Sequence, residues 1–507
     1  MFLPDAQRPF FVHFSEVIPL LKTIQTVSGH IGSGKSRSFH EWYAGRQIPI
    51  VLATPTNTLS HQHHAYFSTE GVVSAVISQD EGYRSAKEEF DRRMTEGYDG
   101  IPIVNHTVAL TVDTDVANHV LVLDEIPSPV NTIYIEFENA SDVADFSVIE
   151  ADIPGYYKLV SSAHAISLVN DAQDREGTKY TIFGTKAREL GEKILNDHYQ
   201  VVIDKESFDN AASGKSFRLK ADGTAPRVFL QFTIFMLPSI VDQYKATIMI
   251  GANQEKTLLA RMWSKDVKFE TNHDIQRRLD YDDLSHKANL AKIYYPPIPN
   301  LSKTFLKRLG SNNEEAGQQL FLDTVADGIS ELFSGKRHIF CTNKHSHSNR
   351  EYRWKLEGKT GKRVITNPHG WNDLQDYDMA VFMAAINYDP ETERRLSDFY
   401  GISRKQAKEA LAYELVYQFL GRTSLRSKDS QNEVILVVPD EGAARCIQAI
   451  IGCAEPTPLP IEFGIEGRKT GRPRVEKSIE QKQAENRLRV ARHREKQKAA
   501  SAAQLSL

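Results

Sequence analysis

The sequence has little cysteine, no long apolar run and no strong excess of charge of either sign. Each of these absences excludes a class of protein. Cys341, Cys446 and Cys453 are the only cysteines in 507 residues, and their spacing suits neither a disulfide framework nor a metal site. No apolar stretch approaches the ~20 residues that cross a bilayer, and the apolar N-terminus lacks the features of a signal peptide. We therefore expect reduced thiols and a cytoplasmic protein without a membrane partner.

The net charge is only −4, but its distribution along the chain is uneven. Residues 468–498 contain twelve Lys and Arg and four Glu, which gives this segment about +8 and leaves the remainder near −12. A basic end on an acidic body predicts a tail that binds nucleic acid. Within the tail, residues 469–474 resemble an AT-hook core, whose Arg472 and Arg474 would enter an A·T minor groove. A generic basic segment would also bind phosphates.

A complete phosphate-binding loop begins at Gly29. Residues 29–36 read G-H-I-G-S-G-K-S and match G-x-x-x-x-G-K-[ST], after the apolar run 22–28 and before the helix-like stretch 37–43. This setting predicts that backbone N–H groups surround a β-phosphate, while Lys35 reaches the β- and γ-phosphates and Ser36 ligates Mg²⁺. We expect ATP and Mg²⁺ to be bound by Gly29, Gly32, Ser33, Gly34, Lys35 and Ser36.

Two adjacent carboxylates follow another short apolar run. Residues 120–123 predict a buried strand that delivers Asp124 and Glu125 to its C-terminal end, where α/β sheets place their ligands. Asp124 is suited to hold Mg²⁺ beside the phosphate loop. Glu125 is suited to orient and deprotonate the water that attacks the γ-phosphate. Together with the loop, the pair predicts a site that hydrolyses ATP.

Short apolar runs alternate with helix-like segments, which indicates parallel α/β architecture. The expected strands, besides 22–28 and 120–123, are 48–54, 101–105, 245–253, 338–342, 379–383 and 434–438. Residues from about 128 to 240 show a mixed sequence pattern in place of this alternation and predict an insertion. Strand candidates within it are 132–137, 180–183 and 229–235. A polar stretch at about 265–288 predicts an interdomain connection. We expect an ATP-binding domain over 1–288, a second α/β domain over 289–455, and a basic, partly disordered or helical tail over 456–507.

Asp124-Glu125-Ile126-Pro127 resembles the DExx box of the superfamily 2 helicases and translocases, and other segments resemble further motifs of that family in its order. Thr54-Pro55-Thr56 is similar to the motif that contacts a nucleic-acid phosphate. Residues 250–253 are similar to the small-residue segment that couples hydrolysis to domain movement, although they depart from its commoner Ser-Ala-Thr form.

Two further motifs fall in the second half of the chain. Gly370, Asn372 and Asp373 lie in a segment that looks like the fifth motif, which touches nucleic acid and nucleotide. Residues 418–426 resemble the sixth motif, with its catalytic positions at Gln418, Arg422 and Arg426. Arg426 comes one residue later than usual, whereas Arg422 keeps the expected spacing from Gln418 and is the preferred arginine finger.

The resemblance implies two stacked RecA-like domains, the first binding ATP with Mg²⁺ and the second supplying the arginine finger. Arginine suits this role because it stays charged and contacts phosphate oxygens bidentately. The implied activity is ATP hydrolysis coupled to translocation along nucleic acid or to strand separation, on DNA rather than RNA, in replication or recombination with replication proteins as partners. The motif set looks like that of phage and mobile-element replication helicases, which implies a bacterial or phage-infected host cytoplasm.

Two alternatives share the phosphate loop. A viral packaging motor ATPase would carry a nuclease domain with clustered acidic ligands, where this chain instead has the segments around Gly370 and Arg422. An ATP-switched replication initiator that binds DNA would not need fast turnover, whereas Glu125 and Arg422 stand at motif positions that favour fast turnover. Outside the motifs, His61, His63 and His64 form a cluster that no cysteine or carboxylate completes, and we expect solvated histidines at a helix start.

Overall fold

The computed structural model describes residues 22–46, 48–173, 182–217, 227–310, 313–345, 350–368, 370–371 and 373–463. The predicted nucleic-acid contacts Asn372, Arg472 and Arg474 lie outside these ranges. The described residues up to Ile461 form one compact unit, to which the following description refers. Within the described ranges, no helix has the length and apolar character needed to cross a membrane.

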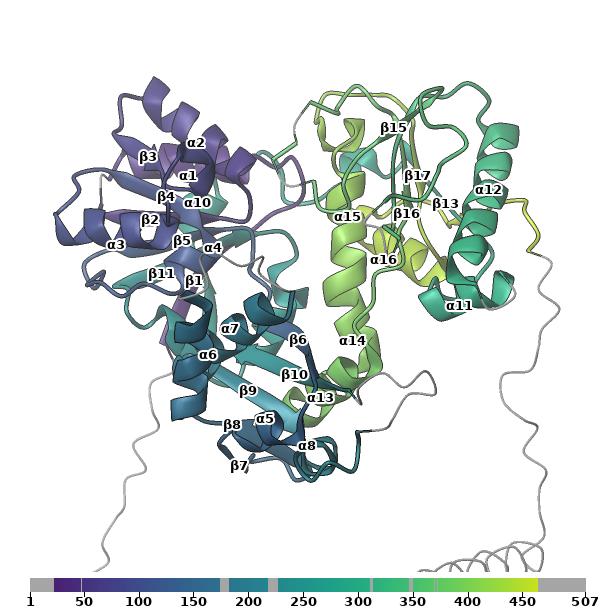
Figure 1. The fold of residues 1–507 in the computed structure, drawn as a ribbon. Coiled ribbons are helices and arrows are strands. Elements are labelled where there is room, and N and C mark those ends of the chain that lie inside the picture. Colours follow the sequence, from purple (N-terminus) through teal and green to yellow (C-terminus); the bar gives the residue numbers. More distant parts are fainter. Residues whose placement is uncertain are drawn as a thin grey trace, which may run out of the picture. The chain divides into compact units, whose positions relative to one another are not determined.

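A seven-stranded parallel sheet carries the phosphate loop (Figure 1). Its strands are β1 (Lys22–Ser28), β2 (Ile50–Thr54), β3 (Ser74–Val76), β4 (Ile101–Asn105), β5 (Val120–Asp124), β11 (Ala246–Gly251) and β12 (Val267–Thr271), in the order β12-β1-β11-β5-β2-β4-β3. Its helices are α1 (Lys35–Ala44), α2 (Asn57–Thr69), α3 (Ala86–Thr95), α4 (His106–Ala109), α9 (Leu258–Trp263) and α10 (His273–Gln276). Val122 packs in the core with α1 and α2, whereas Leu121 and Leu123 pack with α3, α4 and α9. Because both faces are covered, the central strands β11, β5 and β2 are buried along nearly their whole length.

A second parallel sheet follows in the chain and has six strands in the order β15-β14-β16-β17-β13-β18. They are β13 (Ala291–Tyr295), β14 (His338–Thr342), β15 (Gly361–Arg363), β16 (Met379–Met383), β17 (Val434–Val437) and β18 (Thr457–Pro458). The helices of this part are α11 (Lys303–Leu309), α12 (Glu314–Leu332), α13 (Pro390–Tyr400), α14 (Arg404–Lys408), α15 (Glu414–Leu420) and α16 (Glu441–Ile451). A π-helical turn, Glu409–Tyr413, joins α14 to α15.

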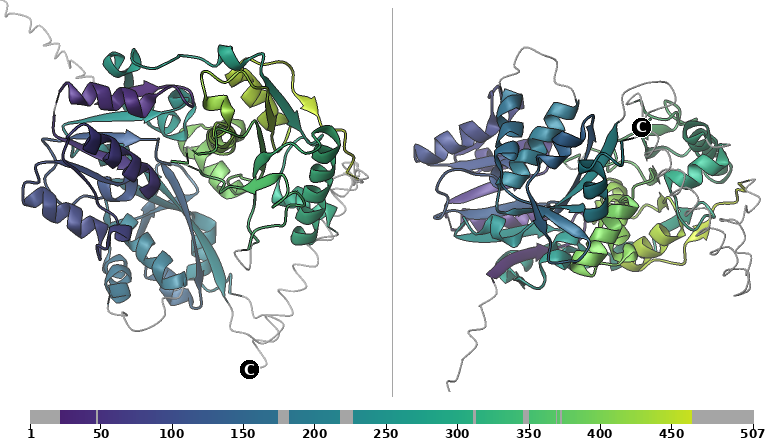
Figure 2. Two further views of the ribbon diagram at one scale, coloured as in Figure 1. Left: turned by 90° about the horizontal axis from the view of Figure 1, so that it is seen from above. Right: turned by 60° about the horizontal axis from the view of Figure 1, so that its bottom comes forward.

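Between β5 and β11 the chain forms the insertion sheet, a five-stranded antiparallel sheet in the order β6-β10-β9-β8-β7 (Figures 1 and 2). Its strands are β6 (Val130–Phe137), β7 (Val148–Glu150), β8 (Tyr156–Leu159), β9 (Tyr199–Asp204) and β10 (Val228–Met236). Its helices are α5 (Ala140–Ala144), α6 (Ala163–Gln173), α7 (Ile182–Leu195) and α8 (Lys205–Ala212). Phe232 and Ile234 of β10 share a core with residues of these helices, so the insertion buries a hydrophobic core of its own.

The predicted fold class, parallel α/β sheets of the RecA-like type with a mixed insertion, is confirmed. Two local predictions are wrong. Residues 182 and 183 begin α7 rather than a strand, because the helical period continues through Leu190 and Ile194 into the core of the insertion. The stretch 265–288 is not a connection over its whole length, since its residues 267–271 form β12, which pairs in parallel with β1. As an edge strand, β12 buries only Val267 and therefore lacks the apolar run of an inner strand. The predicted domain boundaries stay predictions.

Helix α13, which precedes the π-helical turn, packs on the insertion sheet. Arg395 is only 1% exposed, and its guanidinium donates to the Thr233 hydroxyl at 2.7 Å and to the carbonyl of Gln231 at 3.1 Å. The ring of Phe235 lies 5.1 Å from that of Tyr400. Thr233 and Phe235 alternate along β10 with Phe232 and Ile234. One face of the strand therefore packs in the core of the insertion, and the other face contacts α13.

Replacing Arg395 with alanine should lower the free energy of unfolding by about 3 kcal/mol, because it opens a cavity and leaves a buried hydroxyl and a carbonyl without their donor. Denaturant unfolding measures this change. The neighbouring Arg394 is a matched control, since its side chain is 49% exposed and pairs with Asp204 at 3.1 Å. Arg394→Ala should cost less than about 1 kcal/mol. Equal losses for the two variants would contradict the stabilising role assigned to the buried Arg395.

Candidate nucleotide-binding site

The phosphate loop joins β1 to α1 and depends on glycine at two positions. Gly32 and Gly34 both have φ of 78°, in the left-handed region that favours glycine. A Cβ at Gly32 would lie 2.3 Å from the main-chain oxygen of Arg426, in the segment after α15. Ser33 is fully buried within the loop. The loop therefore has the predicted strand–loop–helix setting, and its glycines allow a close approach to the facing segment.

The Lys35 ammonium group folds back onto this loop. It donates hydrogen bonds to the carbonyl oxygens of Gly29 at 2.9 Å and His30 at 3.0 Å. Burial lowers the pKa of Lys35, and the carboxylates of Glu125 and Asp124 act in the opposite direction. The cation thus lies between the loop and two carboxylates, and its predicted contact with the β- and γ-phosphates stays a prediction.

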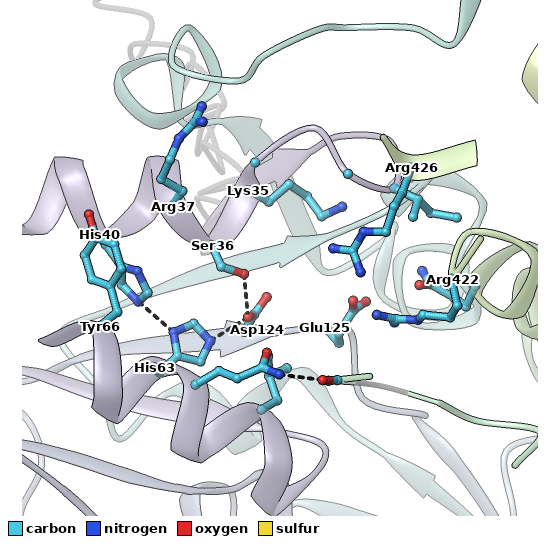
Figure 3. Close-up of a pocket in the computed structure, with 17 residues that line it drawn as sticks. Lys35, Ser36, Arg37, His40, His63, Tyr66, Asp124, Glu125, Arg422 and Arg426 are labelled. Carbon is cyan, nitrogen blue, oxygen red and sulfur yellow. Dashed lines mark hydrogen bonds and ion pairs between the residues drawn. The ribbon is translucent and has the colours of Figure 1, made fainter. Parts of the chain in front are cut away.

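Ser36 and Asp124 lie next to each other in the site (Figure 3). The Ser36 hydroxyl, in the first turn of α1, donates to Oδ2 of Asp124 at 3.1 Å. A hydroxyl and a carboxylate are oxygen ligands that Mg²⁺ takes together with substrate phosphates, so this pair fits the predicted metal. Burial opposes the ionisation of Asp124, yet the hydrogen bond from His63 and the charge of Lys35 hold its pKa below the ordinary value.

Glu125 has a backbone conformation that is uncommon outside glycine. Its φ is 68°, and its N–H donates to the carbonyl of Ile250 on β11 at 2.8 Å. A left-handed conformation at a residue with a side chain costs ~1–3 kcal/mol, and such strain clusters at functional sites. The Glu125 carboxylate faces the cavity between Asp124 and Arg422 (Figure 3).

Two arginines reach the same cavity from the segment after α15. Arg422 and Arg426 line it together with Lys35, Asp124 and Glu125, and its volume is about 300 Å³. Arg422 is 6% exposed, and burial together with the charge of Arg426 lowers its pKa to about 10, against the attraction of Glu125. Burial also lowers the pKa of Arg426. Both side chains point toward the carboxylates and Lys35 (Figure 3).

The phosphate loop packs directly on α15. A Cβ at Gly421 would lie 2.2 Å from Cδ1 of Ile31, so only glycine fits at this position without a shift. The Tyr417 hydroxyl lies 2.9 Å from Nδ1 of His30 and accepts the N–H of Ile31 at 3.3 Å. A displacement of α15 therefore has to change the contacts of the loop.

Gln418 faces a carboxyl group that the sequence motifs do not include. Its amide donates to Oε1 of Glu414 at 2.8 Å, and the Asn253 amide donates to Oε2 at 3.2 Å. Burial raises the pKa of Glu414 to about 7, while these two hydrogen bonds lower it. Glu414 thus links the loop after β11 to α15. Glu414 lies outside the segments 250–253 and 418–426 that resemble helicase motifs, and no pattern around it in the sequence indicates a role in the site.

The prediction of solvated histidines is wrong for His63. Its side chain is 1% exposed, and Nε2 lies 2.7 Å from Oδ2 of Asp124. His61 keeps a side chain that is 48% exposed, and His64 bonds to Ser74. The error arises because the contact of His63 spans 61 positions in the chain, so no local pattern indicates it.

The predicted nucleic-acid segment lies at the end of β2. Thr54 is fully buried, and its hydroxyl shares a 2.7 Å hydrogen bond with that of Ser60. Pro55 and Thr56 are partly exposed, and the Thr56 hydroxyl caps α2 by accepting the N–H of Leu59. The contacts of Thr54, Pro55 and Thr56 with nucleic acid stay predictions.

The segment that resembles the fifth motif contributes one residue to the cavity. Gly370 lines it, and its carbonyl accepts a hydrogen bond from Gln62 of α2. Asp373 is exposed and is not among the residues that line this cavity. The nucleotide contacts predicted for Gly370 and Asp373 stay predictions.

No protein-family model matches the chain, and no curated protein sequence matches it. Among solved structures, S. tokodaii Xpd4 is similar at 10% identity and a TM-score of 0.44, over 86% of this chain and 96% of that one. The XPD_APO structure is similar at 9% identity and a TM-score of 0.46, over 86% and 97%. A S. cerevisiae Dbp5 variant bound to RNA and ADP BeF3 is similar at 11% identity and a TM-score of 0.33, over 87% and 86%. At this level of likeness, the function has to be inferred from the geometry of the site.

Proposed function

We propose that this chain is an ATP-dependent helicase or translocase of the superfamily 2 type. One observation carries the proposal: Lys35 and the carboxylates Asp124 and Glu125 share a cavity with Arg422 and Arg426, which come from the part of the chain that carries the second parallel sheet. Cations from two sides and a carboxylate beside them are the groups that phosphoryl transfer to water requires. From the sequence resemblance we further propose DNA as the substrate, in replication or recombination of a phage or mobile element.

Each group has a role in this proposal. Mg²⁺ held by Ser36 and Asp124 would neutralise charge on the β- and γ-phosphates. Glu125 orients the attacking water and accepts its proton. Lys35 binds the phosphate oxygens from the loop side, and Arg422 stabilises the charge that develops on the transferred phosphoryl group.

The position of the arginines also supports a motor. Arg422 follows α15, and α15 packs on the phosphate loop through Tyr417 and Gly421. A γ-phosphate therefore attracts both sides of the cavity, and its departure removes that attraction. If the open and closed states hold a nucleic-acid backbone differently, each cycle of hydrolysis advances the protein along the strand.

The proposal is tested by measuring ATP turnover with and without single-stranded DNA and RNA, together with strand displacement on 3′- and 5′-tailed duplexes. We expect Mg²⁺-dependent turnover that nucleic acid stimulates, more strongly with DNA, and displacement from one tail polarity. Stimulated turnover without displacement would indicate a translocase. Turnover that no nucleic acid stimulates would contradict a motor and favour a nucleotide switch.

A further inference from the structure

Helix α2 buries a histidine against the carboxylate that is expected to bind Mg²⁺. His63 lies 2.7 Å from Oδ2 of Asp124 through its Nε2 (Figure 3). An ionised carboxylate only accepts hydrogen bonds, so Nε2 of His63 carries the proton of this bond. The Ser36 hydroxyl donates to the same oxygen, and Oδ1 takes part in neither bond. Two donors thus fix one oxygen of Asp124 and leave the other for a ligand.

A second histidine sets the tautomer of the first. Nε2 of His40 lies 2.7 Å from Nδ1 of His63. In the tautomer of this pair that leaves Nδ1 of His40 without a proton, Nε2 of His40 donates and Nδ1 of His63 accepts. The buried Nδ1 of His40 has no hydrogen-bond partner among the described residues, which agrees with a nitrogen that carries no proton. Burial, together with the proximity of His63, lowers the pKa of His40 to about 3, so this ring is neutral.

The geometry of His40 is fixed by packing and by its place on α1. Its ring stacks on Tyr66 at a centroid distance of 4.0 Å and an interplanar angle of 21°, and meets Phe67 edge-on at 4.7 Å. Ser36 and His40 are one helical turn apart, so they lie on the same side of α1. The helix that carries the Ser36 hydroxyl therefore also carries the group that orients His63.

We propose that His63, held in its Nε2–H tautomer by His40, is a positioning residue that presents Asp124 to Mg²⁺. The histidine does not touch the metal or the nucleotide in this proposal and acts through the carboxylate. Such outer partners fix the orientation of a metal ligand, and their loss commonly weakens metal binding 10- to 100-fold. The inference rests on the proposed function, because it requires a Mg²⁺–nucleotide site.

The test measures binding of the fluorescent analogue mant-ADP to the full chain, with Mg²⁺ titrated from zero. His63→Leu removes the donor at similar volume and should weaken the apparent affinity for Mg²⁺ by roughly 10- to 100-fold. Its mant-ADP affinity without Mg²⁺ should equal that of the parent. His63→Gln can place an amide N–H near the position of Nε2 and should restore most of the Mg²⁺ affinity. His64→Leu, one position along α2, is the matched control and should change neither quantity.

The outcomes separate the inference from the function on which it rests. A parent protein whose mant-ADP binding ignores Mg²⁺ would overturn the proposed function, and the inference with it. A parent that responds to Mg²⁺ while His63→Leu responds equally well would overturn the inference alone. Equal weakening with and without Mg²⁺ would mean that His63 only supports the fold, which also overturns it. If His63→Leu does not fold, His40→Phe keeps the stack on Tyr66, removes the donor to His63, and should still weaken Mg²⁺ binding; an unchanged affinity in this variant contradicts the inference.

Discussion

Replacing Lys35 with alanine should abolish nucleic-acid-stimulated ATP hydrolysis and leave the fold intact. Among the described residues, the hydrogen bonds of the ammonium group go to the carbonyl oxygens of Gly29 and His30 within its own loop. Its removal therefore costs the folded protein on the order of 1 kcal/mol through two lost hydrogen bonds at a partly buried position. The effect on a bound γ-phosphate should be much larger, because it would lose the cation on the loop side. The neutral N–H groups of the loop cannot replace that charge.

The measurement combines turnover at saturating single-stranded DNA with thermal unfolding of the same preparation. Lys268 provides a matched control, because it lies on the edge strand β12 and its side chain is 62% exposed. Lys268→Ala should retain the turnover of the parent. Normal turnover in Lys35→Ala would mean that the loop does not bind the hydrolysed nucleotide, whatever the state of the fold.

The phosphate loop and eight strands of the two parallel sheets (β1, β2, β4, β5, β11, β14, β16 and β17) could be predicted because their signals are local. The loop depends on four fixed positions within eight residues, and β2, β4 and β5 are short apolar runs buried on both faces. The edge strand β12 was missed for the same reason, since only Val267 is buried there. Local pattern thus identifies strands that are apolar runs, and it misses short or partly polar strands, namely β3, β12, β13, β15 and β18.

The partners of the site could not be predicted, because they depend on which distant segments meet. His63 is 61 positions from Asp124, and Glu414 is 161 positions from Asn253. Neither residue differs in its own sequence setting from an ordinary residue of an amphipathic helix. The left-handed conformation of Glu125 is equally hidden, since glutamate has no preference for it. The fixed motif positions predict the reacting groups, whereas only the three-dimensional contacts indicate the groups that would orient them.

The insertion shows the same limit. The change of sequence pattern after Pro127 predicted its presence. Its attachment to α13, however, depends on the hydrogen bond from Arg395 to Thr233, 162 positions away. Arg395 lies in a charged segment that reads as an exposed helix, because Glu391, Glu393 and Arg394 surround it in sequence. Only the packing of α13 on β10 makes this one arginine a buried residue.

Replacing Arg422 with alanine should reduce the rate of ATP hydrolysis by roughly 10³- to 10⁵-fold, the range for arginine fingers in related phosphoryl-transfer sites. Its guanidinium points toward Glu125 (Figure 3). Since the charge on the phosphoryl oxygens develops in the transition state, the loss should fall on the rate rather than on mant-ADP binding. Single-turnover hydrolysis and mant-ADP binding on the same variant separate the two effects.

Arg422→Lys tests whether charge alone is sufficient. A lysine keeps the positive charge but lacks the planar pair of donors that contacts two phosphate oxygens, so we expect it to recover only a small part of the rate. Arg445→Lys is the matched control, because its side chain is 52% exposed on α16 and does not line this cavity. Full activity in Arg422→Lys would show that the site needs a charge at this position and not an arginine. A loss confined to nucleotide affinity would make Arg422 a binding residue, and Arg426, which lines the same cavity, would then be the remaining candidate for the finger.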